Sequence, residues 1–92
     1  KIKSESNSWQ LIDVRTKEEF TLDPLKEAVN IPLSDLEIQI HKLKPQQSLY
    51  FICQSGIRSL TAVSIARNQY PDCESHSIMG GVNLWNTLIK ST

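Results

Sequence analysis

Residues 49–59 have the sequence L-Y-F-I-C-Q-S-G-I-R-S, an apolar run followed by a cysteine, a glycine-containing loop and an arginine. The apolar run includes aromatic and β-branched types, which favour a central strand covered on both faces. Cys53 lies where that strand is expected to end. Ser55 and Gly56 suit a tight turn whose backbone amides converge on one point, and a helical pattern begins near Ile57. Because a helix N-terminus and a nearby arginine both favour the thiolate, Cys53 is a candidate nucleophile.

The size and charge of the chain exclude several classes of function. A length of 92 residues predicts one domain over residues 1–92. Lys plus Arg and Asp plus Glu number 10 each, a balance that favours neither nucleic acid nor an anionic membrane as a partner. No apolar run approaches the ~18 residues that span a bilayer. Because the sequence begins with Lys1 rather than methionine, we expect it to be a trimmed chain, a processed product or a piece of a longer polypeptide.

The two cysteines, Cys53 and Cys73, show no metal-binding pattern. There is no C-x-x-C pair, and the only histidines are His41 and His76, which argues against a zinc site. We therefore expect no metal and no other cofactor. So sparse a pair is typical of free thiols in a reducing compartment, which predicts a cytoplasmic protein, with one disulfide between the two cysteines as the alternative.

Short strand patterns alternate with helical patterns along the chain. Strands are expected at residues 9–14, 28–31, 49–52 and 75–79, and helices at about 16–20, 34–44, 57–68 and 82–89. Residues 1–8 are polar and are expected to form a frayed end. This alternation implies parallel β-α units, and therefore a small doubly wound α/β fold with a mainly parallel sheet and helices on both faces.

Two capping boxes predict where the first two helices begin. Thr16 with Glu19 begins the first helix, which ends before Pro24 because the residue ahead of a proline disfavours the α conformation. Ser34 with Glu37 is expected to begin the second helix. The last helix is expected to bury one apolar stripe, formed by Val82, Trp85, Leu88 and Ile89.

Several polar or glycine positions follow the predicted strands directly. In a parallel sheet, functional sites lie at the carboxyl ends of the strands. Cys53 is at such an end, and so are the corner at Asp13 and Arg15 and the turn at Gly80 and Gly81. We expect these three segments to meet at one rim of the sheet. Asp13 itself is expected to hydrogen-bond the backbone of the following turn rather than to take part in chemistry.

Four motifs in register resemble those of a single-domain rhodanese. They are D-V-R-x-x-x-E-F from residue 13, A-x-N-I-P from residue 28, C-x-S-G-x-R-S from residue 53 and G-G-x-x-x-W from residue 80. The resemblance implies a compact rhodanese-like α/β domain and a sulfurtransferase cycle. In that cycle the loop cysteine takes sulfane sulfur from a donor, forms a persulfide and passes the outer sulfur to an acceptor.

The resemblance also implies roles for the loop residues. Cys53 would be the sulfur carrier, and the backbone amides of the loop would bind the anionic persulfide. This substrate-binding set comprises Gln54, Ser55, Gly56 and Ile57. Arg58 would close the loop, hold the amides in place and add positive charge as a second catalytic residue.

Further residues would support the site from outside the loop. Asp13 and Arg15 match the signature corner of the family, and Glu19 is expected to pair with Arg15, four positions earlier. Gly80 and Gly81 match a turn that lets the backbone pass close beneath the site.

The sequence departs from the family pattern in two places that matter. The strand and helix that usually precede the first strand are short or missing, so four or five strands are expected. Gln54 is neutral where many relatives have Arg or Lys, which should weaken the binding of thiosulfate and makes a protein persulfide an alternative donor. The acceptor would be a thiol, cyanide or a sulfur-carrier protein.

Two other functions stay open. Phosphatases and arsenate reductases also place an arginine after a nucleophilic cysteine, but in C-x5-R, one residue longer than the C-x4-R of Cys53 and Arg58. A non-catalytic or regulatory module would share the fold, although inactive relatives typically lose the cysteine. Some rhodanese domains are fused to ubiquitin-like activating enzymes, so fusion to such a domain is also expected to be compatible with this chain.

Overall fold

The computed structural model describes residues 9–90, without the side chains of residues 89 and 90. Within these residues four strands form one sheet in the order β2-β1-β3-β4, and every neighbouring pair is parallel. The strands are β1 (Trp9–Asp13), β2 (Ala28–Asn30), β3 (Ser48–Ile52) and β4 (Ser75–Ser77). The helices are α1 (Lys17–Leu22), α2 (Leu33–Gln39), the 3-10 helix η2 (Ile40–Lys42), α3 (Arg58–Gln69) and α4 (Gly81–Lys90). The expected frayed end, residues 1–8, lies outside the described residues.

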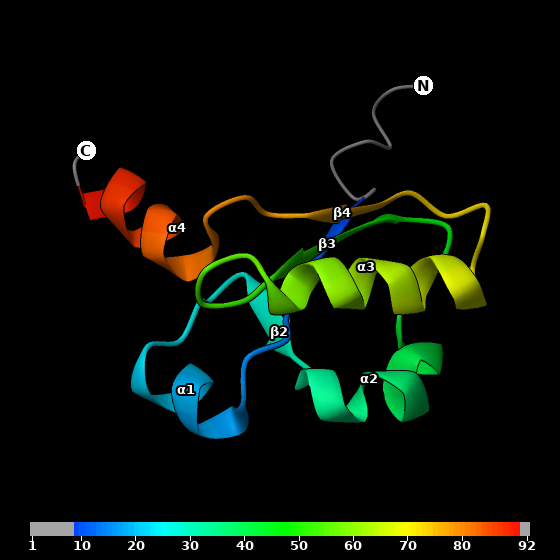
Figure 1. Ribbon diagram of the computed structural model, residues 1–92, viewed down its shortest axis with the longest axis horizontal. Helices are drawn as coiled ribbons and strands as arrows, with labels where there is room; N and C mark the ends of the chain where they lie inside the picture. The colour runs from blue at the N-terminus through cyan, green and yellow to red at the C-terminus, as the bar shows by residue number, and fades with distance from the viewer. Residues whose placement is uncertain (1–8, 91–92) are drawn as a thin grey trace.

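Helices α2 and α3 lie side by side on one face of the sheet (Figure 1). The core beneath them takes alternate residues of β3, Leu49 and Phe51, both fully buried. Ala62 and Ala66 of α3 are also fully buried, because their small side chains let the helix approach the sheet closely. The apolar run at the centre of the sequence therefore forms the central strand, as predicted.

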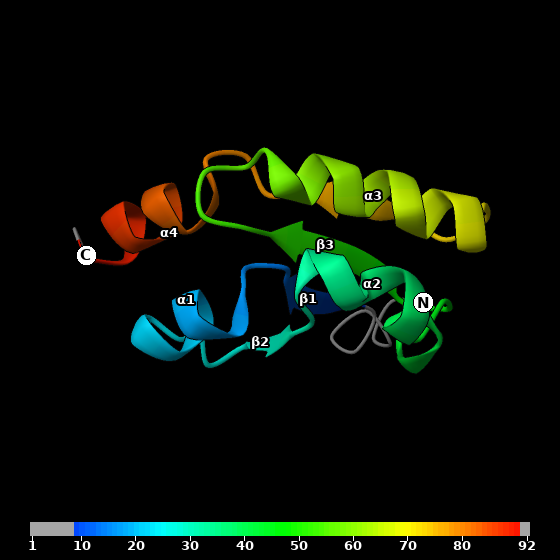
Figure 2. The ribbon, with the colours of Figure 1, turned by 60° about the horizontal axis from the view of Figure 1, so that its bottom comes forward.

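The opposite face is covered by the start of α4 and by the loop after α1. Val82 and Leu25 pack there with Leu11 and Ile52. Tyr50 on this face is only half-buried, so the predicted burial of β3 on both faces is incomplete at this residue. Figure 2 shows that α1 and α4 both lie beyond the carboxyl end of β3, next to the loop that leads to α3.

The first predicted capping box is correct and the second is wrong. Glu19 N–H donates to Thr16 Oγ1 at 3.1 Å, and Thr16 N–H donates to Glu19 Oε1 at 2.9 Å. Helix α2 begins at Leu33, one residue before the predicted Ser34 cap, and no side chain caps it. Leu33 N–H donates instead to Val14 O at 3.0 Å. A contact with the end of β1 therefore fixes where α2 begins.

The end of α2 and the course of α4 also differ from the prediction. The helix expected up to residue 44 is α-helical only to Gln39 and then continues as η2. In α4, Val82 is buried, but Leu88 is 58% exposed because the helix runs past the end of the sheet (Figure 1). Among residues 9–90, no helix is long and apolar enough to cross a lipid bilayer.

Candidate active site

The loop after β3 carries Cys53 into the first turn of α3. Gly56 has a φ of +103°, in the left-handed region that glycine adopts without strain. A Cβ atom at this position would lie 3.2 Å from Gly80 N, so the loop and the turn before α4 are in close contact. This geometry folds residues 54–57 around the sulfur, and Cys53 is only 1% exposed.

Hydrogen-bond donors surround the Cys53 sulfur. Gly56 N–H donates to Cys53 Sγ at 3.1 Å, and Ser59 N–H donates at 3.3 Å. The Ser59 hydroxyl lies 3.6 Å from the same sulfur, and Ser59 is fully buried. A thiolate accepts such hydrogen bonds far better than a neutral thiol does, so the loop binds the anionic form of sulfur.

These donors decide the pKa of Cys53. Burial alone raises the pKa of the Cys53 thiol, because water no longer solvates the thiolate. The hydrogen bonds from the Ser59 hydroxyl and N–H, and then from the Gly56 and Ser55 N–H groups, outweigh burial and hold the pKa below its ordinary value. A larger thiolate fraction at neutral pH makes Cys53 the better nucleophile.

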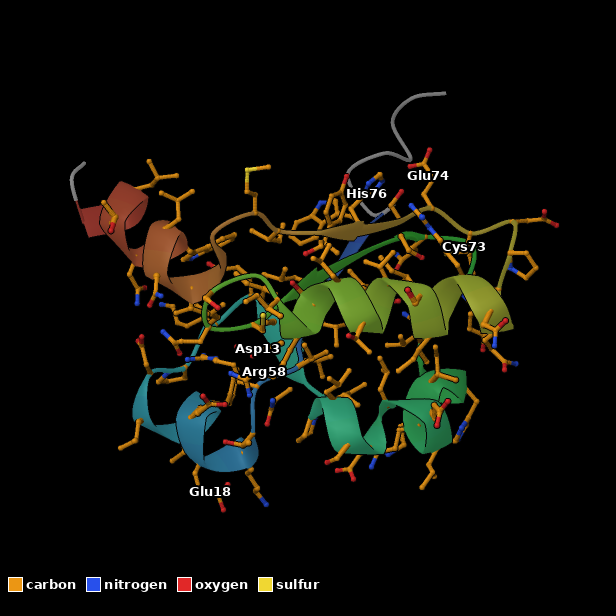
Figure 3. The ribbon with its side chains drawn as sticks, in the orientation of Figure 1. Asp13, Glu18, Arg58, Cys73, Glu74 and His76 are labelled. Atoms are coloured by element: carbon orange, nitrogen blue, oxygen red, sulfur yellow. The ribbon has the colours of Figure 1, made fainter. Side chains whose placement is uncertain are left out.

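Arg58 pairs with a carboxylate of α1. Its Nη1 and Nη2 donate to Glu19 Oε1 and Oε2 at 2.8 and 3.0 Å. Figure 3 shows Arg58 between the start of α3 and α1, whereas Glu18 points away from the site. The Arg58 hydrogen bonds, followed by that from Thr16 N–H, lower the pKa of Glu19 to about 2. One prediction is corrected: Glu19 pairs with Arg58 and not with Arg15.

Arg15 forms a buried ion pair with Asp13 at the end of β1. Arg15 Nη2 lies 2.8 Å from Asp13 Oδ2, and both side chains are at most 1% exposed. Arg15 also donates to Asp23 O at 2.7 Å and to Gln54 Oε1 at 3.3 Å. Arg15 N–H donates to Asp13 Oδ1 at 3.0 Å, the backbone hydrogen bond that the sequence predicts for this aspartate. One guanidinium thus joins β1, the loop after α1 and the loop of the cysteine.

The glycine turn before α4 passes directly beneath the cysteine loop. Gly81 has a φ of +60°, and a Cβ atom there would collide with the carbonyl oxygen of Cys53. Val82 N–H donates to Cys53 O at 2.8 Å, and Asn83 N–H donates to Gln54 O at 3.1 Å. The first turn of α4 therefore holds the first two carbonyl groups of the loop, and the close passage expected at this turn is present.

The structure thus gathers the residues expected at the site, but the loop residues differ in orientation. Gly56 turns its amide toward the sulfur, whereas Ile57, immediately before α3, is 73% exposed. Within residues 9–90, no three His, Cys, Asp or Glu side chains are grouped so that they could hold a metal ion.

Sequence reasoning assigned no role to two hydroxyl groups near the sulfur. Ser59 Oγ lies 2.6 Å from Ser77 Oγ, which belongs to β4. The position of Ser59 could have been noticed, because the first turn of a helix that follows a nucleophile lies beside it. Ser77 carries no such signal, because only the tertiary packing of α3 against β4 brings it close.

The model of the rhodanese-like domain family matches residues 1–88. The uncharacterized protein YqhL of Bacillus subtilis (strain 168) is 35% identical over 83 residues, which are 89% of this chain and 64% of YqhL. The adenylyltransferase and sulfurtransferase MOCS3 of Drosophila ananassae is 32% identical over 82 residues, which are 82% of this chain and 18% of MOCS3. The structure of the human single-domain sulfurtransferase TSTD1 is 30% identical with a TM-score of 0.77, over 89% of this chain and 84% of TSTD1.

The chain belongs to the rhodanese-like domain family. Its parallel four-stranded α/β fold is the fold of that family, and its likeness to TSTD1 supports an enzyme of the sulfurtransferase type. The chain spans less than two thirds of YqhL and about a fifth of MOCS3, so the domain also occurs within longer proteins.

Proposed function

We propose that the protein is a sulfurtransferase that carries sulfane sulfur as a persulfide on Cys53. The observation that carries this proposal is the set of donors around the sulfur: two N–H groups and a buried hydroxyl lie within 3.6 Å of Cys53 Sγ. They favour an anion on the sulfur, and they favour the anionic persulfide for the same reason.

The proposed reaction is a pair of displacements on sulfur. The Cys53 thiolate attacks the outer sulfur of the donor, so that a new S–S bond forms while the bond between that sulfur and the donor breaks. The donor leaves with the electron pair of the broken bond. The acceptor, a thiolate, cyanide or a sulfur-carrier protein, then attacks the outer sulfur of the persulfide, and Cys53 leaves as a thiolate. No external oxidant or reductant is consumed.

Intact-protein mass spectrometry tests this function. After exposure to thiosulfate or to a cysteine-desulfurase persulfide, the wild-type chain should gain the mass of one sulfur atom, and cyanide should remove it. Cys53→Ser should gain none, while the matched control Cys73→Ser should behave as the wild type. A wild-type chain that gains no sulfur from either donor would contradict the proposal and favour a non-catalytic module.

The charges at the site favour a protein persulfide over thiosulfate as the donor. Arg15 and Arg58 each have a carboxylate partner, and Gln54 is neutral, so within residues 9–90 no unbalanced cation at the loop attracts a small dianion. The exposed side chains next to the loop are apolar instead: Ile57 is 73% and Met79 is 84% exposed. Exposed apolar residues of this kind suit contact with a protein surface.

A charge placed at position 54 tests the donor class. Gln54→Arg should raise kcat/KM for thiosulfate about tenfold or more, because a hydrogen bond to a charged group contributes about 1.5 kcal/mol or more. It should change kcat/KM for a protein persulfide much less. If the wild-type chain uses thiosulfate as efficiently as the variant does, the charge argument is wrong.

The two alternative functions fare differently. A phosphatase or arsenate reductase would need its arginine to face an oxyanion inside the loop, and the pairing of Arg58 with Glu19 weighs against that role. A module within a larger protein stays the alternative to an independent enzyme. MOCS3 bears both adenylyltransferase and sulfurtransferase in its name, so an attached activating-enzyme domain, with a carrier protein as the acceptor, is the context that this alternative proposes.

A further inference from the structure

Two serine hydroxyls form a chain that begins at the Cys53 sulfur. Ser59 Oγ lies 3.6 Å from Cys53 Sγ and 2.6 Å from Ser77 Oγ. Ser59 is fully buried, so these two groups are the hydrogen-bond partners of its hydroxyl. The distance of 2.6 Å between the two serine oxygens is that of a hydrogen bond between hydroxyls, in which either oxygen can be the donor.

The direction of that hydrogen bond controls what Ser59 offers to the sulfur. A hydroxyl has a single hydrogen. If Ser59 donates it to Ser77, only oxygen lone pairs face the sulfur, and the thiolate gains nothing from the hydroxyl. If Ser77 donates to Ser59, the Ser59 hydrogen is free to point at the thiolate.

We infer that Ser77 is a positioning residue of the sulfur-transfer site, which donates its hydroxyl hydrogen to Ser59 and so directs the Ser59 hydroxyl toward the Cys53 sulfur. The same pair of serine hydroxyls can also form hydrogen bonds when Cys53 is protonated. When Cys53 is a thiol, its S–H donates to Ser59, Ser59 donates to Ser77, and both hydroxyls have reversed. Ser77 is half-buried and lines an open groove between β4 and α3, so water can complete its hydrogen bonding in either state.

The charged groups around the loop do not depend on Ser77. They form two ion pairs, Glu19 with Arg58 and Asp13 with Arg15. His76, the neighbour of Ser77 in β4, points to the opposite face of the sheet and stacks on Tyr50 with ring centroids 5.0 Å apart. The first turn of α4 carries no acidic residue. Arg67 of α3 lines the same groove as Ser77, but its Nη2 donates to the backbone carbonyl of Ser75 at 3.4 Å and not to a side chain of β4. A change at Ser77 should therefore reach Cys53 through Ser59 and not through a moved charge.

The test measures the pH midpoint of the Cys53 thiolate from its ultraviolet absorbance, in a Cys73→Ser background that leaves one thiol. Ser77→Val and Ser77→Thr have nearly the same shape and differ by the hydroxyl. Ser77→Val should raise the midpoint by roughly 0.5 to 1 pH unit, which lowers the thiolate fraction at neutral pH about three- to tenfold. Ser77→Thr should keep the wild-type midpoint.

A matched control lies two residues away on the same face of β4. Ser75 is 2% exposed, and its Oγ has no hydrogen-bond partner among the described residues. Ser75→Ala removes a buried hydroxyl from the same strand but leaves the hydrogen bond between Ser77 and Ser59 in place. It should therefore leave the pH midpoint of Cys53 unchanged. A shift in Ser75→Ala equal to that in Ser77→Val would overturn the proposal, because it would show a general effect of β4.

The route through Ser59 is tested by a double substitution. Ser59→Ala should raise the midpoint, and Ser77→Val should add almost nothing to it, because Ser77 then has no hydroxyl to direct. Equal effects of Ser77→Val in the two backgrounds would overturn the proposal, as would a wild-type midpoint in Ser77→Val. The inference rests on the proposed function only in taking Cys53 as the reacting group. Absorbance needs no sulfur transfer, so the two can fail separately.

Discussion

The pKa values of the two thiols of this chain differ in a way that burial does not explain. Cys53 is the more deeply buried, yet its pKa is held below the ordinary value by the hydrogen bonds that outweigh burial. Cys73 is only partly buried, and its pKa is raised, first by burial and then by the charge of Glu74. Figure 3 shows Cys73 beside Glu74, far along the molecule from Asp13 and Arg58 at the candidate active site.

The difference lies in the neighbours of each sulfur. Cys53 follows a strand and meets the N–H groups at the start of α3. Cys73 precedes a strand and meets carbonyl groups: its Sγ donates to Gln47 O at 3.2 Å. A thiol that is a donor to carbonyls gains from keeping its proton, whereas a sulfur surrounded by donors gains from losing it. The position of a cysteine at the carboxyl end of a parallel strand thus matters more than its depth.

The largest change in the difference between the pKa values of Cys53 and Cys73 should come from Gly81→Ala. The new Cβ atom would collide with the carbonyl oxygen of Cys53, in a backbone conformation that alanine adopts with strain. We expect a loss of roughly 2 to 4 kcal/mol in the free energy of unfolding. The pKa of Cys53 should rise toward that of Cys73, whose pKa should not move. Chemical denaturation and thiol titration measure both effects, and a stable variant with an unshifted Cys53 pKa would contradict the close packing of this turn.

A smaller effect should show whether Arg58 acts on Cys53 through its charge or by holding the loop in place. Arg58→Ala removes a positive charge near Cys53 and should raise the Cys53 pKa by about half a pH unit. Glu19→Gln removes the link between α3 and α1 but leaves that positive charge unbalanced, so it should not raise the Cys53 pKa. Titration of both variants, with Cys73 as the internal reference, measures this. A rise of equal size in the two variants would mean that Arg58 acts on Cys53 only by holding the loop.

Strong acid should weaken the ion pair between Glu19 and Arg58. The pKa of Glu19 is about 2 in the folded protein against an ordinary 4.5, so its contribution is fully present above pH 4.5 and is lost as the pH falls through 2. Because the pair is partly exposed, we expect about 1 kcal/mol or less. Glu19→Gln should flatten the fall in unfolding free energy over this range. Glu18→Gln, in the same turn but pointing away, should retain it, and identical curves for both variants would exclude the pair as the cause.

The smallest predicted effect concerns Cys73. Glu74→Gln removes the negative charge that helps to raise the Cys73 pKa and should lower that pKa by roughly 0.3 pH unit at low salt. Most of the elevation should remain because burial is the larger cause. The Cys53 pKa should stay constant. Titration at low and high salt checks this, and an effect that persists at high salt would point to a cause other than charge.

Much of the fold follows from local patterns. The apolar run before Cys53 could only be a buried strand or helix, and its length and aromatic content favoured the strand. Thr16 and Glu19 cap α1 as predicted because both partners belong to one turn. The start of α2 could not be predicted in the same way, since Leu33 N–H donates to the carbonyl of Val14, just after β1. A contact between distant segments here overrides the local Ser34 signal.

The ion pairs at the site could not be predicted from local sequence patterns either. Spacing alone favours a pair between Glu19 and Arg15, but Arg15 precedes α1 and is already buried against Asp13. Glu19 is therefore left for Arg58, which is far away in the sequence. The loop sequence could predict Cys53 and its amides because they are neighbours in the chain. The serine of β4 could not be found, since nothing in its own surroundings points to the sulfur.

The hydrogen bonds between the first turn of α4 and the cysteine loop have a consequence for the newly synthesised chain. Proteins are synthesised from the N-terminus, and the N–H groups that bind the carbonyls of Cys53 and Gln54 belong to Val82 and Asn83. Cys53 therefore emerges about 30 residues before the last groups that shape its loop. Until those residues fold beneath it, the loop lacks the two hydrogen bonds that hold its first two carbonyl groups. Cys53 is thus synthesised well before the residues that complete the loop around it.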